Sequence, residues 1–93
     1  MNNNNIIVTE HAYRRAKERF NWKPKVTYKM AIRAYYNGVT YNEINNYVRK
    51  YIDNKTLNRI SNNIILYGEI LFLFRDNSLL TLHHVPAFVK TKI

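Results

Sequence analysis

Three side chains near the start of the chain recur every four residues: His11, Arg15 and Arg19. In an α-helix this spacing places all three on one face. A histidine exchanges a proton near neutral pH, and the planar guanidinium of arginine binds phosphate oxygens through several N–H donors. The set therefore suits a phosphodiester, with arginine on the charged oxygens and histidine on the proton. The plainer interpretation is a solvated face, in which the arginines pair with Glu18 and His11 supports the first helical turn.

A second group of polar side chains lies near the other end of the chain, at Thr81, His83 and His84. On a strand, Thr81 and His83 share one face and His84 takes the other, so one histidine is expected to point toward the helices and one away. Adjacent histidines that diverge, without a carboxylate cluster nearby, do not make a metal site. No cofactor motif is present either, so we predict neither metal nor cofactor. The alternative is that both histidines are ordinary strand residues, one of them semi-buried.

Basic and aromatic residues gather around the first of these groups. They are Arg14, Lys17, Trp22, Lys23 and Lys25. Basic side chains contact phosphates, and aromatic rings beside them can stack on bases, so these residues are candidates for nucleic-acid binding. For Arg14 and Lys17, a solvated helix face is the simpler explanation.

The chain as a whole is strongly basic. Its 93 residues include 15 Lys and Arg but 6 Asp and Glu, a net charge of +9. Residues 1–33 hold 8 of the basic and 2 of the acidic side chains, which is +6 (8 − 2) in the first third of the chain. A concentrated positive field attracts polyanions. We therefore expect an anionic partner, RNA above all, with DNA or an acidic protein as alternatives, although a generically basic small protein has the same composition.

Composition also excludes several classes of protein. Without cysteine there is no disulfide scaffold, thiol nucleophile or Cys-ligated zinc site, and such a chain suits a reducing cytoplasm. No window of about 18 apolar residues is present, so no membrane contact is expected. The opening Asn run lacks the features of a signal peptide. We expect residues 1–5 to be a disordered tail and residues 6–93 to be one basic domain.

The elements that must position these side chains begin with helices. Ile6, Ile7 and Val8 read as a first strand or a hydrophobic staple. Thr9 is a good N-cap for a helix that runs to about Phe20. We expect Thr27 to cap a second helix that ends before Gly38. The run Thr40–Glu43 matches a capping box, so it should open a third helix whose apolar stripe is Ile44, Tyr47, Val48, Tyr51 and Ile52.

The pattern changes to strands in the last third of the chain. Apolar runs at 64–67, 70–74 and 79–83 are separated by the short turns Gly68-Glu69 and Asp76-Asn77, and Val89–Ile93 reads as a last short strand. The sequence predicts an α+β fold, with two or three N-terminal helices on a C-terminal antiparallel sheet of three or four strands. We expect the second sheet face to be polar or to need a partner. One core should unite Ile44, Val48, Tyr51, Phe72 and Leu82.

Three segments carry a resemblance to a known family. Residues 8–19 read VTEHAYRRAKER, residues 67–74 read YGEILFLF and residues 80–86 read LTLHHVP. They resemble the helix start and the closing hairpin of the RelE/BrnT-like toxin superfamily of small RNase-fold proteins. The resemblance implies a compact α+β fold with helices against a curved sheet. Members include metal-independent ribonuclease toxins, and also phage and mobile-element proteins without assigned activity.

The resemblance extends to individual positions. His11, Arg15 and Arg19 match the helix-start motif, Thr81 matches the last-strand threonine, and the two neighbouring histidines lie where some relatives carry sheet-borne catalytic groups. The chain also departs from the pattern.

RelE-type ribosome-dependent enzymes use Arg and Tyr near the C-terminus, whereas here no Arg follows Arg75 and no Tyr follows Tyr67. This departure argues against RelE-style mRNA cleavage and leaves a histidine-based mechanism, or none.

Two functions remain open at this point. The first is a toxin-type ribonuclease, in which His11 and His83 or His84 act as base and acid while Arg15 and Arg19 stabilise the charge on the phosphate. The second is a non-catalytic phage or mobile-element protein that binds nucleic acid, or inhibits a host protein, through its basic face. The expected partners are RNA or another polyanion, and an antitoxin or host protein. An exposed sheet edge would also fit a homodimer.

Overall fold

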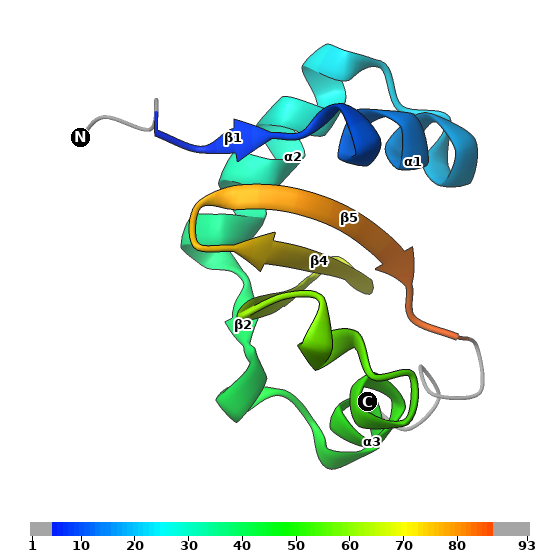
Figure 1. Cartoon of the computed structure of the whole chain (residues 1–93), viewed down its shortest axis with the longest axis vertical. Helices are drawn as coiled ribbons and strands as arrows, with labels where there is room; N and C mark the ends of the chain where they lie inside the picture. Colours follow the sequence, from blue (N-terminus) through cyan, green and yellow to red (C-terminus); the bar gives the residue numbers. More distant parts are fainter. Residues whose placement is uncertain (1–4, 87–93) are drawn as a thin grey trace.

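A five-stranded sheet runs through the middle of the fold, with the strand order β1-β5-β4-β3-β2 (Figure 1). The structure is a computed structural model that describes residues 5–86. Its strands are β1 (Ile7–Val8), β2 (Val39–Thr40), β3 (Asn63–Tyr67), β4 (Ile70–Arg75) and β5 (Ser78–His84). Its helices are α1 (Glu10–Phe20), α2 (Pro24–Asn37) and α3 (Asn46–Asn54), with the 3-10 turns η1 (Tyr41–Glu43) and η2 (Leu57–Arg59).

The predicted α+β class is confirmed, but the sheet is larger than expected and is mixed. Strands β3, β4 and β5 form the predicted antiparallel meander. The two-residue strand β1 then joins β5 in parallel, and β2 joins β3 at the opposite edge. The run Ile6–Val8 was predicted to be a first strand or a staple, and it contains β1. The two-residue strand β2 was not predicted, because alternation needs several residues to show. The predicted strand at Val89–Ile93 lies outside the described residues, as do residues 1–4.

Helix α1 begins and ends where the sequence predicts. Thr9 is its N-cap: the hydroxyl oxygen accepts the backbone N–H of Ala12 at 3.2 Å. The same hydroxyl donates to the carbonyl of Leu79 at 2.8 Å, which fastens the start of the helix to β5. The helix ends at Asn21, whose φ of 56° is left-handed. Asparagine tolerates this conformation better than most residues.

The second helix begins earlier than the sequence predicted. Thr27 is not its cap but a buried interior residue, and its hydroxyl donates to the carbonyl of Lys23 at 3.2 Å. Pro24 takes the first helical position instead, because its fixed φ suits a helix start and its missing N–H costs nothing there. Gly38 ends the helix with φ −77°. A β-carbon at Gly38 would lie 2.2 Å from Cγ2 of Ile65, so packing excludes a side chain at this position.

The third helix begins later than predicted. The hydroxyl of Thr40 does bond the carboxylate of Glu43, at 3.3 Å, but the pair closes only the 3-10 turn η1. The backbone at Ile44 is then extended, and its side chain is buried. Helix α3 starts two residues on, where the side chain of Asn45 accepts the backbone N–H of Tyr47 at 2.7 Å.

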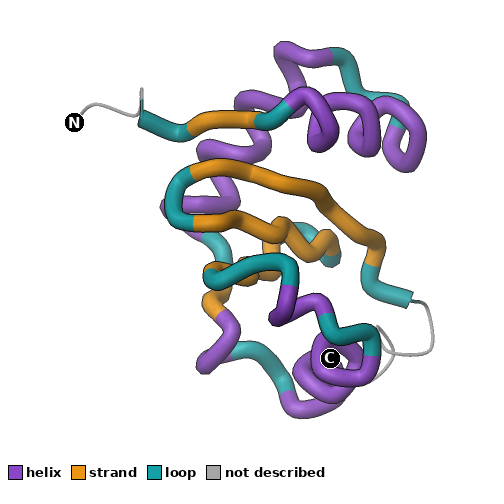
Figure 2. Tube along the Cα trace, viewed as in Figure 1, coloured by secondary structure: helices purple, strands orange, loops and turns teal. Residues whose placement is uncertain are grey.

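The sheet is covered by helices on both faces, which was not expected (Figure 2). Helices α1 and α2 pack on the face that carries Phe72 and Leu82. Helix α3 packs on the other face, where Ile44 and Val48 join a second core. The prediction of one core for these residues and Tyr51 is therefore wrong. Successive residues of a strand point to opposite faces, and α3 folds back across the face that appeared to need a partner.

Two tight turns join the long strands at the predicted positions. Gly68 and Glu69 both have positive φ, 60° and 64°, as a two-residue hairpin between twisted strands requires. Asp76, with φ 57°, opens the turn from β4 to β5. The side chain of Asn77 in that turn donates to the carbonyl of Asn5, so the last residue of the predicted tail is tied to the sheet. Among the described residues, no helix combines the length and apolarity needed to span a bilayer.

Candidate functional site

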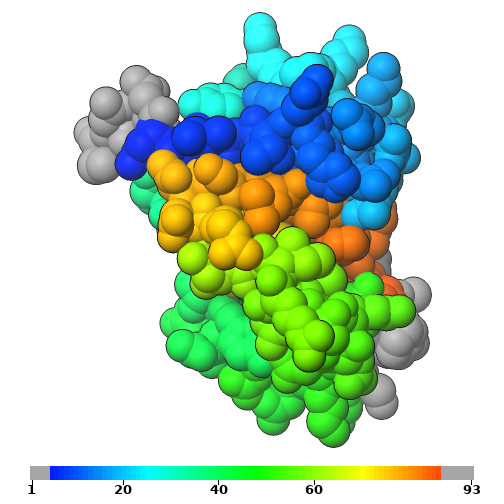
Figure 3. Space-filling model, in the orientation of Figure 1, coloured from blue at the N-terminus to red at the C-terminus, as the bar shows by residue number. Residues whose placement is uncertain are grey.

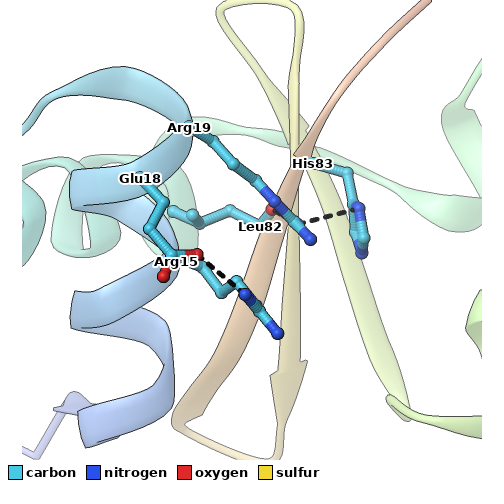
Figure 4. Close-up of polar contacts among 5 residues, drawn as sticks. All are labelled: Arg15, Glu18, Arg19, Leu82 and His83. Carbon is cyan, nitrogen blue, oxygen red and sulfur yellow. Dashed lines mark hydrogen bonds and ion pairs between the residues drawn. The ribbon is translucent and has the colours of Figure 1, made fainter.

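Helix α1 lies along β5, and Arg19 joins the two elements near their ends (Figure 4). Nη1 of Arg19 donates to the carbonyl of Leu82 at 2.6 Å and lies 3.1 Å from Nδ1 of His83. A guanidinium has no acceptor, so in this contact Nδ1 of His83 must accept. The neutral ring then carries its hydrogen on Nε2, where it is a donor.

This contact exists because β5 is longer than its outer neighbour. Strand β1 pairs only with Ser78 and Leu79, so within residues 5–86 the rest of that edge has no strand partner. Side chains from α1 take its place. The hydroxyl of Thr9 reaches the carbonyls of Leu79 and Leu80, and Arg19 reaches the next outward carbonyl. A backbone carbonyl at the edge of β5 thus accepts its hydrogen bond from the guanidinium of Arg19, and an anionic ligand can approach the same guanidinium.

Arg15 stands one helical turn before Arg19 and points toward the same strand (Figure 4). It forms an ion pair with Glu18, in which Nη1 and Oε1 are 2.7 Å apart. Both side chains are partly exposed, at 35% and 52%, so the pair is worth little in water. An anion with more than one charged oxygen can therefore compete with Glu18 for Arg15.

The surroundings of His83 disfavour its charged form. Burial is the largest cause that lowers its pKa from 6.5 to about 4, followed by the charges of Arg19 and Arg15. The ring is therefore neutral at pH 7. A bound anion would offset the two arginine charges and bring the pKa back toward its ordinary value.

The low pKa of His83 makes the stability of the fold depend on pH. Well above pH 6.5 the ring is neutral in the folded and unfolded chains alike, and the contribution of His83 to the free energy of unfolding is fully present. Between about 6.5 and 4 the unfolded chain binds a proton at this ring that the folded chain does not. The contribution of His83 therefore falls through this window and falls no further below it.

We expect a loss of about 1–2 kcal/mol, reduced from the full pKa difference because the ring is partly exposed. Urea unfolding at several pH values, for the wild type and His83→Gln, measures it. Since Gln does not titrate, parallel pH profiles of the two proteins would contradict the expectation.

The other strand histidine has a different position, as the alternation predicted. His83 is in register with Leu71, which belongs to the core under α3, whereas His84 is in register with Ile70 on the face of α1 and α2. Nε2 of His84 donates to the carbonyl of Arg19 at 3.1 Å. Its exposed ring packs on Phe20, with 4.1 Å between ring centroids.

Two other predicted site residues, Thr81 and His11, lie outside the cluster of Arg15, Arg19 and His83. Thr81 shares its face of β5 with His83 but is buried, with 7% of its surface exposed. His11 is exposed on the first turn of α1, and no hydrogen bond in residues 5–86 links it to His83 or His84. The structure thus brings Arg15, Arg19 and His83 together and leaves His11 further along the same helix.

The predicted nucleic-acid contacts lie on α1, in the loop after it and in the first turn of α2. The four basic side chains are exposed: Arg14, Lys17, Lys23 and Lys25. Trp22 is half-buried and stacks on Phe20, with ring centroids 4.9 Å apart. In the space-filling view the surface of α1 directly adjoins that of β5 (Figure 3). The basic helix and the strand edge therefore form one continuous face.

A surface pocket on α3 was missed by sequence reasoning. It is lined by Tyr41, Asn46, Tyr47, Arg49, Lys50 and Asp53. Tyr47 was predicted to be in the apolar stripe but is 53% exposed. The hydroxyl of Tyr41 donates to Asp53 at 2.7 Å, and this hydrogen bond raises the pKa of Tyr41. The signal was the polar face of the helix, since Asn46, Arg49, Lys50 and Asp53 recur at helical spacing.

Among residues 5–86, no three His, Asp or Glu side chains gather as a metal site would require. Neither a protein-family model, nor a curated protein, nor a solved structure matches the chain. The resemblance to RelE/BrnT-like toxins therefore stays a prediction, and the function must be argued from the cluster at Arg15, Arg19 and His83.

Proposed function

We propose that this chain binds RNA and that Arg15, Arg19 and His83 hold a backbone phosphate at the edge of β5. The observation that carries the proposal is the contact of Arg19 with Nδ1 of His83 at 3.1 Å, next to a second arginine. Two guanidinium groups and the Nε2 hydrogen of a neutral imidazole are donors that suit phosphate oxygens. The net charge of +9 adds long-range attraction for a polyanion. RNA is preferred over DNA because of the family resemblance.

The arrangement of the site without a ligand supports binding better than catalysis. Nδ1 of His83 already accepts a hydrogen bond from Arg19, so its other nitrogen is a donor and not a base. His84 uses Nε2 against the carbonyl of Arg19. A bound ligand would have to draw Arg19 away from His83 before Nδ1 of His83 could take part in proton transfer. A cysteine-free chain with an RNA partner suits the cytoplasm, where we place its action.

A comparison of four arginine variants tests the proposal. Arg15→Ala and Arg19→Ala should each weaken RNA binding about tenfold, because each removes a charge-assisted hydrogen bond. Arg33→Ala and Arg49→Ala remove the same charge elsewhere and should change the affinity by about twofold or less, through the general field alone. Fluorescence anisotropy of a labelled RNA at low salt measures all four. Equal losses would mean a diffuse basic footprint without a site.

A second candidate function is metal-independent RNA cleavage, and a titratable histidine beside two arginines favours it. The RNA 2′-OH would attack the adjacent phosphorus and release the 5′-oxygen, leaving a cyclic phosphate. The two arginines would stabilise the charge on the phosphorane. His83, freed from Arg19 and with a pKa raised by the phosphate, would exchange one proton. His11, on the same face of α1, would exchange the other.

Incubation of the purified protein with labelled total RNA in EDTA tests this second function. If cleavage occurs, His11→Gln and His83→Gln should each reduce it at least about a hundredfold, since each removes a proton-transfer group. Melting temperature at pH 7.5 should change little, and so should RNA affinity, because a glutamine at position 83 still offers an N–H donor to the phosphate. If the wild-type protein binds RNA without cleaving it, the cleavage function is refuted and the binding function remains. Variants that melt much earlier would show that these histidines are structural.

A further inference from the structure

Three aromatic rings lie in contact at the end of α1. His84 packs on Phe20 with 4.1 Å between centroids, and Trp22 stacks on the same ring at 4.9 Å. The imidazole of His84 is held in place by its hydrogen bond to the carbonyl of Arg19. His84 is nevertheless exposed, although its register partner Ile70 is buried. A ring that is both fixed and exposed has already lost its rotational freedom and can stack on a further ring.

This ring lies directly beside the phosphate-binding cluster. Arg19 links the two: its backbone carbonyl holds His84, while its side chain contacts the carbonyl of Leu82 and the ring of His83. His83 and His84 are neighbours in the chain but lie on opposite faces of β5. A ligand that covers the strand edge at Arg19 therefore meets phosphate donors on one side and an aromatic ring on the other.

We propose that His84, backed by Phe20, is a base-stacking subsite for single-stranded RNA bound at Arg15, Arg19 and His83. The inference rests on the proposed function, and it defines the class of RNA. A single strand exposes the faces of its bases beside its phosphates, so one nucleotide can fill both subsites. In a duplex the base faces are covered by their neighbours in the stack, and only the phosphates are available. Nδ1 of His84 is left to accept a hydrogen bond from the base.

Paired probes of equal charge separate stacking from phosphate binding. One is a single-stranded RNA of about eight nucleotides, and the other is the same ribose-phosphate strand without bases. We expect the abasic strand to bind the wild type roughly 5- to 150-fold more weakly, which is the usual contribution of one stacked base. His84→Ala should lower the affinity for the RNA to that of the abasic strand and leave the abasic affinity unchanged. His84→Phe keeps a ring and should retain most of the preference.

Further variants and outcomes make the test decisive. Tyr36→Ala removes an exposed tyrosine on α2 and should retain the full preference for the RNA with bases.

Equal binding of the two strands by the wild type would overturn the stacking subsite while the phosphate site stands. So would a loss on both strands in His84→Ala, or a His84→Phe variant that behaves like His84→Ala. If neither strand binds at low salt, the proposed function itself fails. Because equal binding by the wild type would already overturn the subsite, the proposal can be refuted without any variant.

Discussion

Phe72→Ala should lower the free energy of unfolding by about 3–5 kcal/mol. Phe72 lies in the middle of β4, between Ile65 of β3 and Leu82 of β5, and is fully buried under α1 and α2. Removing the ring loses its burial and leaves a cavity that the paired strands cannot close by moving together. Small domains have only about 5–15 kcal/mol of stability, so much of it would be lost.

Urea unfolding followed by circular dichroism measures the effect. Ile60→Ala is the control, since Ile60 is 45% exposed, and it should cost about 1 kcal/mol or less. A folded Phe72→Ala protein that loses less than about 1 kcal/mol would contradict the packing of β4 described above.

Affinity for RNA should fall about 60- to 1,000-fold when salt rises from 50 to 200 mM. Each neutralised phosphate contributes about −0.7 to the slope of log affinity against log salt for a single strand, and about −0.9 for a duplex. We expect the exposed cations on and after α1 to make about four to six phosphate contacts, so the slope should be roughly −3 to −5.

The double variant Arg15→Ala/Arg19→Ala removes two of these contacts. Its slope should be shallower by about 1.4, whereas Arg33→Ala should leave the slope close to that of the wild type. Binding isotherms at four or more salt concentrations give the values. A flat response for the wild type would exclude a polyanion as the ligand.

The parts of the fold that follow local rules were predictable from the sequence. Thr9 marks the start of α1, and two-residue turns bounded by apolar runs mark the meander. The side of the sheet that α3 covers was not predicted, because it depends on how a distant segment folds back. A signal was present, however. The uninterrupted apolar run Ile70–Phe74 is typical of a strand buried on both faces, and a one-sided sheet would alternate.

The candidate site was predictable only in part, for a similar reason. Helical spacing placed Arg15 and Arg19 on one face, and strand alternation separated the two histidines. The contact of Arg19 with His83 joins residues 64 positions apart, so it follows from the docking of α1 on β5 and not from any local pattern. The role of Phe20 as a support for His84 was hidden in the same way, because Phe20 reads as an ordinary core residue.

The pairing of β1 with β5 has a consequence for how the chain is made. Thr9, at the start of α1, is bonded to Leu79, 70 residues later. A ribosome adds about 5–20 residues per second, so β5 is synthesised several seconds after α1. Ala12 and Ala16, fully buried in the native protein, cannot pack on β5 during that time. A chain whose synthesis stops before β5 therefore lacks the strand to which the start of its first helix is bonded.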